Sequence, residues 1–236
     1  MTPGEHAPVG PATLRAAGLR RVFPHPGGDV EVLRGVDLTV EPGEFVTLAG
    51  RSGSGKSALV AVLCGFDRPD SGTVHIGGDR VTQDLPWRTC AVVPQSLGLT
   101  PELTAAENVA LPLVLGGVPA SEAAATAEAL LSRVQLGAVA DRRPGELSFG
   151  QQQRVALARA VSPRPAVLIA DEPTAHLDTG TTPVVLDMLR DHAVGGGAVL
   201  VATHDDAVHQ VADRRIDLSD GVLELSAADR STTSPR

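Results

Sequence analysis

With 236 residues, the chain is long enough for one α/β domain with a sizeable core. Its formal net charge of −8 argues against binding nucleic acid through the phosphate backbone, because such a protein needs a basic surface. No signal-peptide pattern opens the sequence, and the longest apolar runs are too short to cross a bilayer. We therefore expect a cytoplasmic protein without direct membrane insertion, so any work at a membrane depends on a partner.

The N-terminal part of the chain is predicted to be mostly β-structure. Residues 1–11 are rich in Pro, Gly and Ala and are expected to be disordered. Apolar residues alternate over 14–23 and again over 30–40, with a Pro/Gly-rich turn between, which predicts two strands. Further short strands are expected at 72–78 and 90–93. We expect the strands nearest the N-terminus to form an antiparallel β subdomain.

Residues 50–57 read GRSGSGKS and fit the phosphate-binding pattern G-x-x-x-x-G-K-[ST]. A short apolar run at 44–49 predicts a strand before this loop, and 58–65 have a helical pattern after it. A strand, a glycine-rich turn and a helix N-terminus together offer unpaired N–H groups and a positive dipole end to an anion. Lys56 is the only lysine of the chain, and its compact ammonium suits the β- and γ-phosphates. The alternative is a chance glycine-rich turn, which the flanking patterns disfavour.

Residues 96–162 change to helical character and predict an inserted α-helical subdomain. A capping box at Thr104 precedes an apolar stretch, and an alanine-rich helical pattern follows it. Ser148 and Gln151 form a second Ser-x-x-Gln capping arrangement, after which we expect a helix over 152–161.

Two continuous apolar runs in the C-terminal third predict strands that are buried on both faces of a parallel sheet. The first run ends at Asp171 and Glu172, and the second, over 198–203, ends at His204. A helix is expected over 182–193 between them. The remaining predicted features are a hairpin that joins 216–218 to 222–225 and a polar tail, 226–236, expected to be frayed.

Open α/β sheets bind ligands at the carboxyl ends of their strands, where Asp171 and Glu172 are expected. Asp171 could hold Mg²⁺ through water while Ser57 supplies a hydroxyl ligand. Glu172 could orient and deprotonate an attacking water, and His204 could hydrogen-bond that water or a γ-phosphate. The alternatives are a solvated acidic pair for the two carboxylates and a structural role for the histidine.

Six motifs in this order resemble the ATP-binding subunit of ABC transporters, over about residues 14–225. They are GRSGSGKS, VPQ (93–95), LSFGQQQR (147–154), VLIADEP (167–173), AHLD (175–178) and VATHD (201–205). LSFGQ is decisive, because no other class of phosphate-loop protein carries it. Residues 99–113 and 143–146 look like the lipoprotein-releasing and macrolide-exporting branch, which pairs with permeases that have large extracytoplasmic domains.

The resemblance implies an α/β fold: a P-loop NTPase core with a parallel sheet, an N-terminal antiparallel β subdomain and an inserted α-helical subdomain. The whole chain would be one ABC ATPase domain, with an ATP-binding core over 12–95 and 163–225 and a helical signature subdomain over 96–162.

The resemblance also implies site residues for ATP and Mg²⁺. Glu172 would be the catalytic base, assisted by His204, Gln95 and Lys56. The Mg²⁺ shell would contain Ser57, Gln95 and Asp171. The residues implied to contact ATP are Phe23, stacking on adenine where the family usually has Tyr, then Gly50, Arg51, Ser52, Gly53, Ser54, Gly55, Lys56, Ser57 and Ala58, and from the opposite protomer Ser148, Gly150, Gln151 and Asp178.

Three positions depart from the family pattern. Ala58 stands where the family favours Thr, Phe149 replaces a signature glycine, and Ala175-His176 is a variant of the aspartate loop. None of these changes removes a catalytic group. We therefore expect an active ATPase.

The leading functional prediction is a transporter motor: a head-to-tail homodimer that hydrolyses Mg-ATP and drives a separate transmembrane permease of exporter or mechanotransmission type. Such a subunit would lie on the inner face of the cell membrane through its permease. One alternative is a regulatory ATPase of the cell-division type, which signals through a membrane partner without transport. Another is a soluble ATPase that acts on DNA or ribosomes, but those relatives usually carry two such domains or basic surfaces. We expect no nucleic-acid partner.

Overall fold

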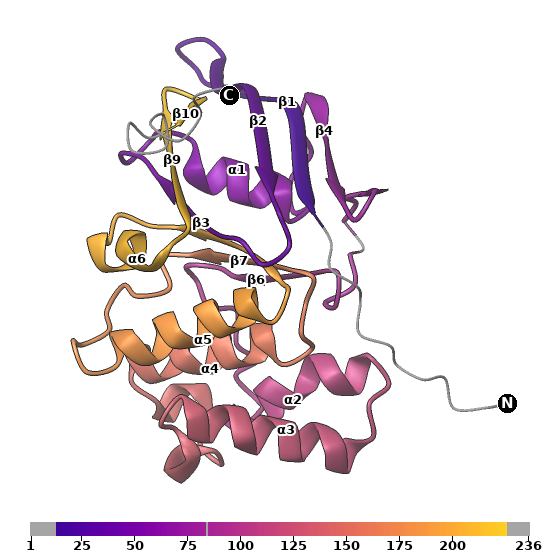
Figure 1. The fold of residues 1–236 in the computed structure, drawn as a ribbon, viewed down its shortest axis with the longest axis vertical. Helices are drawn as coiled ribbons and strands as arrows, with labels where there is room; N and C mark the ends of the chain where they lie inside the picture. Colours follow the sequence, from indigo (N-terminus) through magenta and orange to yellow (C-terminus); the bar gives the residue numbers. More distant parts are fainter. Residues whose placement is uncertain (1–12, 84, 226–236) are drawn as a thin grey trace, which may run out of the picture.

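The structure is a computed structural model that describes residues 13–83 and 85–225 (Figure 1). The expectations for 1–11 and 226–236 lie outside these residues. Two β-sheets and a set of helices form successive layers, and α1 (Lys56–Leu63) lies between the two sheets (Figure 1). Within the described residues, no helix has the length and apolar character needed to span a bilayer.

The strands of the central sheet are β3 (Phe45–Ala49), β6 (Cys90–Val93), β7 (Val167–Asp171), β8 (Ala198–Ala202), β9 (Arg214–Ser219) and β10 (Val222–Leu225). Their order across the sheet is β10-β9-β3-β8-β7-β6, and all neighbours are parallel except the β9–β10 hairpin. Strand β8 is buried along its whole length and β7 over its first four residues, as their continuous apolar sequences predicted. The predicted parallel core is therefore confirmed.

The N-terminal sheet is antiparallel and has the order β2-β1-β4-β5. Its strands are β1 (Leu14–Phe23), β2 (Val30–Val40), β4 (Ser71–Ile76) and β5 (Asp79–Arg80). The two-residue strand β5 is too short to leave a periodic pattern in the sequence. The antiparallel β subdomain is confirmed.

The remaining helices are α2 (Ala105–Leu115), α3 (Ala120–Arg133), α4 (Phe149–Val161), α5 (Thr182–Val194) and α6 (Asp206–Val211), with 3₁₀ turns at Gly137–Val139 and Pro144–Glu146. Helices α4 and α5 cover the face of the central sheet opposite α1, and α2 and α3 lie beyond them (Figure 1). Helices α2, α3 and α4 lie within 96–162, the inserted helical region that the sequence predicted, whereas α5 lies outside it.

Both capping boxes form, and they set where their helices begin. The Thr104 hydroxyl accepts the Glu107 N–H at 3.2 Å, and the Ser148 hydroxyl accepts the Gln151 N–H at 3.3 Å. Because Ser148 is the cap, the next residue is already helical, so α4 begins at Phe149 and not at 152 as predicted. Helix α1 likewise begins two residues before the predicted 58, directly after its cap residue Gly55.

The core consists of two apolar clusters on opposite faces of the central sheet. In β7, Leu168 and Ala170 belong to the cluster with α4 and α5, whereas Val167 and Ile169 belong to the cluster with α1. Because the side chains of β7 alternate between the two clusters, both faces of the strand are packed, and this packing holds its carboxyl end in place. Asp171 and Glu172 are therefore held by a rigid strand.

Candidate active site

The phosphate loop leads into α1 through Gly55, which no other residue could replace without strain. Gly55 has φ +101°, and a Cβ added there would lie 2.6 Å from the Val32 carbonyl oxygen. No side chain caps the helix at this end. The first N–H groups of α1 and its positive dipole end are thus available to an anion.

A cavity of about 590 Å³ opens in front of this loop. It is lined by Val32, Gly50, Arg51, Ser52, Gly53, Gly55, Lys56, Ser57, Ala58, Gln95, Asp171, Glu172 and His204. The structure therefore brings most of the predicted site residues together from four separate segments. Val32 of β2 is the one lining residue that carried no motif and that the sequence did not identify.

Two polar side chains of the loop, Lys56 and Ser54, differ in their hydrogen bonds. The Lys56 ammonium donates to the carbonyl oxygens of Gly50 and Arg51, the second at 3.3 Å. The Ser54 hydroxyl is buried without a hydrogen-bond partner among the described residues. An ammonium bonded only to neutral carbonyls suits an incoming phosphate, whereas Ser54 does not line the cavity.

The two residues that follow β8 hold the Glu172 side chain at the edge of the cavity. Its Oε2 accepts the Thr203 hydroxyl at 3.0 Å, and His204 Nδ1 lies 2.8 Å from its Oε1. This hydrogen bond raises the pKa of His204 above its ordinary value. Thr203 belongs to the VATHD motif, but its role in fixing the carboxylate could not be read from the sequence.

Asp171, like Glu172, is partly buried. Burial raises the pKa of Asp171 first, the neighbouring Glu172 carboxylate raises it further, and Lys56 partly opposes both. Such a carboxylate gains from a nearby cation. Ser57, Gln95 and Asp171 line the same cavity with the oxygen donors that Mg²⁺ prefers. The residues present therefore fit the predicted metal.

Phe23 does not line the cavity. It lies at the end of β1 with 38% of its surface exposed, and the Arg21 guanidinium lies 4.6 Å above its ring centroid. Arg21 is itself held by Asp67, with Nε 2.8 Å from Oδ2. Adenine stacking on Phe23 remains a prediction.

The predicted contacts from the opposite protomer lie apart from this cavity. Ser148, Gly150 and Gln151 form the start of α4, and Asp178 lies in the loop between β7 and α5. Ser148 and Asp178 are exposed, and backbone hydrogen bonds from Thr181 and Gly180 lower the pKa of Asp178. The structure groups these residues on a second, exposed surface of the chain.

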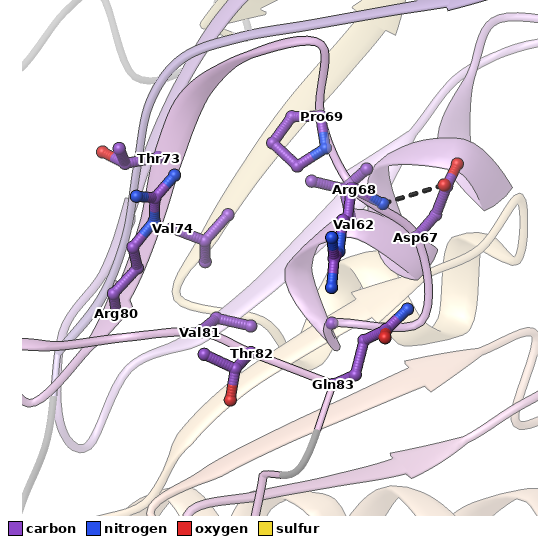
Figure 2. A pocket seen from close by; sticks show the side chains of 11 residues that line it. Val62, Asp67, Arg68, Pro69, Thr73, Val74, Arg80, Val81, Thr82 and Gln83 are labelled. Carbon is purple, nitrogen blue, oxygen red and sulfur yellow. Dashed lines mark hydrogen bonds between the residues drawn. The ribbon is translucent and has the colours of Figure 1, made fainter.

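Another cavity, of about 360 Å³, lies between the end of α1 and strands β4 and β5 (Figure 2). Figure 2 shows Arg68, Arg80 and Asp67 around it together with Val62, Val74 and Val81. It contains none of the predicted site residues. The predicted chemistry therefore belongs to the larger cavity at the phosphate loop.

Comparison with known proteins agrees with this geometry. The sequence pattern of the family described as ABC transporter matches residues 33–175. The chain belongs to the ABC transporter family. It is therefore an ATP-binding subunit and an ATPase of the ABC type, as its motifs predicted.

The relatives place the chain in one branch of the family. It is 43% identical to the lipoprotein-releasing system ATP-binding protein LolD 2 of Caulobacter vibrioides, over 90% of this chain and 96% of that protein. It is 41% identical to the macrolide export ATP-binding/permease protein MacB of Rhodopseudomonas palustris, over 94% of this chain but only 35% of that protein. The chain spans about a third of the length of such ATP-binding/permease relatives. The branch predicted from the sequence is confirmed.

Solved structures show the same fold. A dimeric structure of MJ0796, a bacterial ABC transporter cassette, has a TM-score of 0.83 and 33% identity, over 89% of this chain and 96% of that chain. A dimeric post-hydrolysis state of MJ0796 bound to ADP and Pi has a TM-score of 0.82. The site described above thus lies in a fold that is known to hold a nucleotide.

Proposed function

We propose that the protein is the motor subunit of a transporter: two copies bind Mg-ATP head to tail and drive a separate membrane permease. The observation that carries this proposal is the division of the predicted site. One copy gathers the phosphate loop and the catalytic carboxylates around one cavity, but it exposes Ser148 and Asp178 on another surface. A second copy would supply those groups to the open side of the nucleotide.

Each residue of the cavity has a role in this proposal. Lys56 and the N–H groups at the start of α1 hold the phosphates, and Ser57, Gln95 and Asp171 hold Mg²⁺. The metal, when bound, neutralises charge on the β- and γ-phosphate oxygens. Glu172 orients the attacking water and accepts its proton.

The hydrogen bonds on Glu172 support its role as the base. Thr203 and His204 each engage one carboxylate oxygen, so the group is held in one orientation. The His204 ring is exposed, and its pKa is raised by Glu172, which favours the charged form. A charged imidazole next to the cavity is suited to a γ-phosphate oxygen.

The start of α4 supports the shared site. Its dipole, the Ser148 hydroxyl and its first N–H groups together suit an anion, and they are exposed. The γ-phosphate of ATP still has outward oxygens after Lys56 has bound it. ATP therefore joins two copies, and its hydrolysis releases them.

The permease requires a surface outside the nucleotide cavity. An apolar cavity of about 350 Å³ lies between the end of α1, β6 and α4, and Pro94 places it directly beside Gln95. Phe66 and Trp87 line it with 64% and 38% of their surfaces exposed. The relatives named ATP-binding/permease proteins carry a permease within the same chain. We assign this cavity to the permease, which holds the subunit on the inner face of the membrane as part of an exporter.

A mixing experiment tests the shared site. A Lys56→Ala chain cannot hold the phosphates, and a Ser148→Arg chain cannot complete the site of its partner, so each is inactive alone. Mixed, they form one intact site from the Lys56 of one copy and the Ser148 of the other, and part of the ATPase rate returns. Two active chains mixed at the same total concentration provide the reference rate.

Two results would contradict the proposal. One is a wild-type ATPase rate that rises strictly linearly with protein concentration, which indicates an active single copy. The other is a set of mixtures that never exceeds the rates of the separate variants.

A further inference from the structure

Two of the positions at which this chain departs from its family contact each other. The rings of Phe149 and His176 lie edge to face, with centroids 4.8 Å apart and planes at 73°. Phe149 is the first residue of α4, and His176 lies in the loop that leads from β7 to Asp178. Both side chains are exposed, Phe149 by 46%. The contact therefore joins the two exposed segments that, in the proposed function, face the nucleotide bound by a second copy.

Further contacts along the same face of α4 bring these segments close together. A Cβ added at Gly150 would lie 3.3 Å from the His176 carbonyl oxygen and 3.3 Å from Leu177 Cδ2. One turn later, Gln153 Nε2 donates to the Glu172 carbonyl oxygen at 2.8 Å. The start of α4 thus contacts the loop after β7 at His176, Leu177 and Glu172.

The conformation of His176 depends on these neighbours. It has φ +66°, a left-handed conformation that residues other than glycine rarely adopt, although histidine is among the more tolerant. In such a position the surrounding contacts decide whether the loop keeps its shape. The Phe149 ring supplies the aromatic contact on the His176 side chain.

We infer that Phe149 and His176 act as a positioning pair, which holds Ser148 and Asp178 in one fixed relation so that both meet the nucleotide of a second copy together. This inference rests on the proposed shared site. Neither residue lines the nucleotide cavity of its own copy. The pair therefore governs the association of two copies and leaves nucleotide binding by one copy unchanged.

A double-mutant cycle tests this inference. Phe149→Ala, His176→Ala and the double variant are made in a Glu172→Gln chain, and dimerisation with MgATP is measured by sedimentation. An aromatic pair contributes about 0.5–1.5 kcal/mol, so each single variant should weaken dimerisation about 2- to 12-fold per pair. The double variant should be no weaker than the more affected single variant, because one contact is lost in all three.

Further measurements separate positioning from a general loss of structure. Phe149→Tyr keeps the ring and should restore dimerisation. In the alanine variants MgADP affinity should stay at the parent value, and the unfolding midpoint should fall by no more than about 6 °C, the loss expected for one aromatic contact. With Glu172 present, the alanine variants should need more protein for half-maximal ATPase rate but reach a similar maximum. Val194→Ala, which trims another exposed apolar side chain at a helix end, is the matched control and should change nothing.

The outcomes distinguish the pair from the proposed function. If the Glu172→Gln parent chain does not dimerise with MgATP, the shared site itself is wrong and the pair falls with it. If the parent dimerises but the two single effects simply add, or MgADP affinity falls in step with dimerisation, the shared site stands and the pair is overturned.

Discussion

Glu172, the proposed catalytic base, is held in place by its surroundings. It has φ +53°, and its backbone N–H donates to the Ala202 carbonyl oxygen at 2.8 Å. Its carboxylate is held by Thr203 and His204. A strained backbone conformation that is stabilised by neighbouring strands is common where a group must be held in place for chemistry.

Glu172→Gln removes the base but keeps the shape of the side chain. We expect the ATPase rate to fall by about 10²–10⁴-fold, because a positioned general base contributes about that much. ATP affinity should not fall, and a dimer with trapped ATP should accumulate. A phosphate-release assay and equilibrium binding measure the two effects, and a variant within a few-fold of the wild-type rate would refute the assignment.

Asp171→Asn should stabilise the nucleotide-free protein at neutral pH while abolishing hydrolysis. Because folding raises the pKa of Asp171, its ionisation costs the folded state free energy above that raised pKa. Below the ordinary value of 3.8 the carboxyl is protonated in both states and the cost vanishes. Thermal unfolding should therefore show a higher midpoint for the variant at pH 7 and no difference near pH 3. An equal or lower midpoint at pH 7 would contradict this.

Phe23→Ala tests adenine stacking at the end of β1. If the free face of the ring stacks on adenine, ATP affinity should fall by about 1–3 kcal/mol, by analogy with base–aromatic stacking. The unfolding midpoint should change little, because the ring is only partly buried. Unchanged affinity together with a large loss of stability would instead assign Phe23 to packing against Arg21.

At the scale of elements, α4 connects three parts of the site. Its start carries the signature residues, and its first turns contact the loop after β7 through Gln153. Its far end carries the mostly buried Arg159, whose guanidinium donates to the Leu97 and Gly98 carbonyl oxygens at 2.7 Å each. One rigid helix therefore joins the signature, the catalytic strand end and the loop that follows Gln95.

Arg159→Met keeps an unbranched apolar stem but leaves both carbonyl oxygens without their donor. Burial lowers the pKa of Arg159, although an arginine stays charged in proteins. We expect a loss of about 1–3 kcal/mol in the free energy of unfolding, the cost of unsatisfied buried polar groups. Urea unfolding measures it, and a loss below about 0.5 kcal/mol would show that water satisfies the carbonyl groups instead.

At the scale of the whole molecule, the chain presents three surfaces with different tasks. The cavity at the phosphate loop is assigned to the nucleotide, the exposed start of α4 to a second copy, and the apolar cavity at Phe66 and Trp87 to the permease. The last two are separated by the length of α4, so binding at one can be altered without touching the other.

Phe66→Asp should separate these tasks. A charge at this exposed ring opposes apolar docking, so co-purification with the permease that the wild-type chain captures should be lost. The basal ATPase rate of the free subunit should remain, because Phe66 is outside the nucleotide cavity. Val194→Asp places the same charge on another exposed apolar residue and should keep the permease bound. If both variants capture the permease equally, the docking surface is not at Phe66.

Local chemistry allowed much of this protein to be predicted from its sequence. Alternating and continuous apolar runs predicted the strands, and the capping box at Thr104 predicted where α2 begins, whereas α4 begins three residues before its predicted start. The motif residues Lys56, Asp171, Glu172 and His204 were also predictable, because each follows directly from a loop or a strand end. These features depend on residues within a few positions of each other.

Contacts between distant segments were decided only by the tertiary structure. The approach of Val32 to Gly55, the hydrogen bond from Thr203 to Glu172 and the edge-to-face contact of Phe149 with His176 each join residues far apart in the chain. No periodic pattern records such pairs, because they arise when α1 packs between two sheets and α4 packs on β7. The sequence by itself determined which groups do the chemistry, and packing across the central sheet decided how those groups are held.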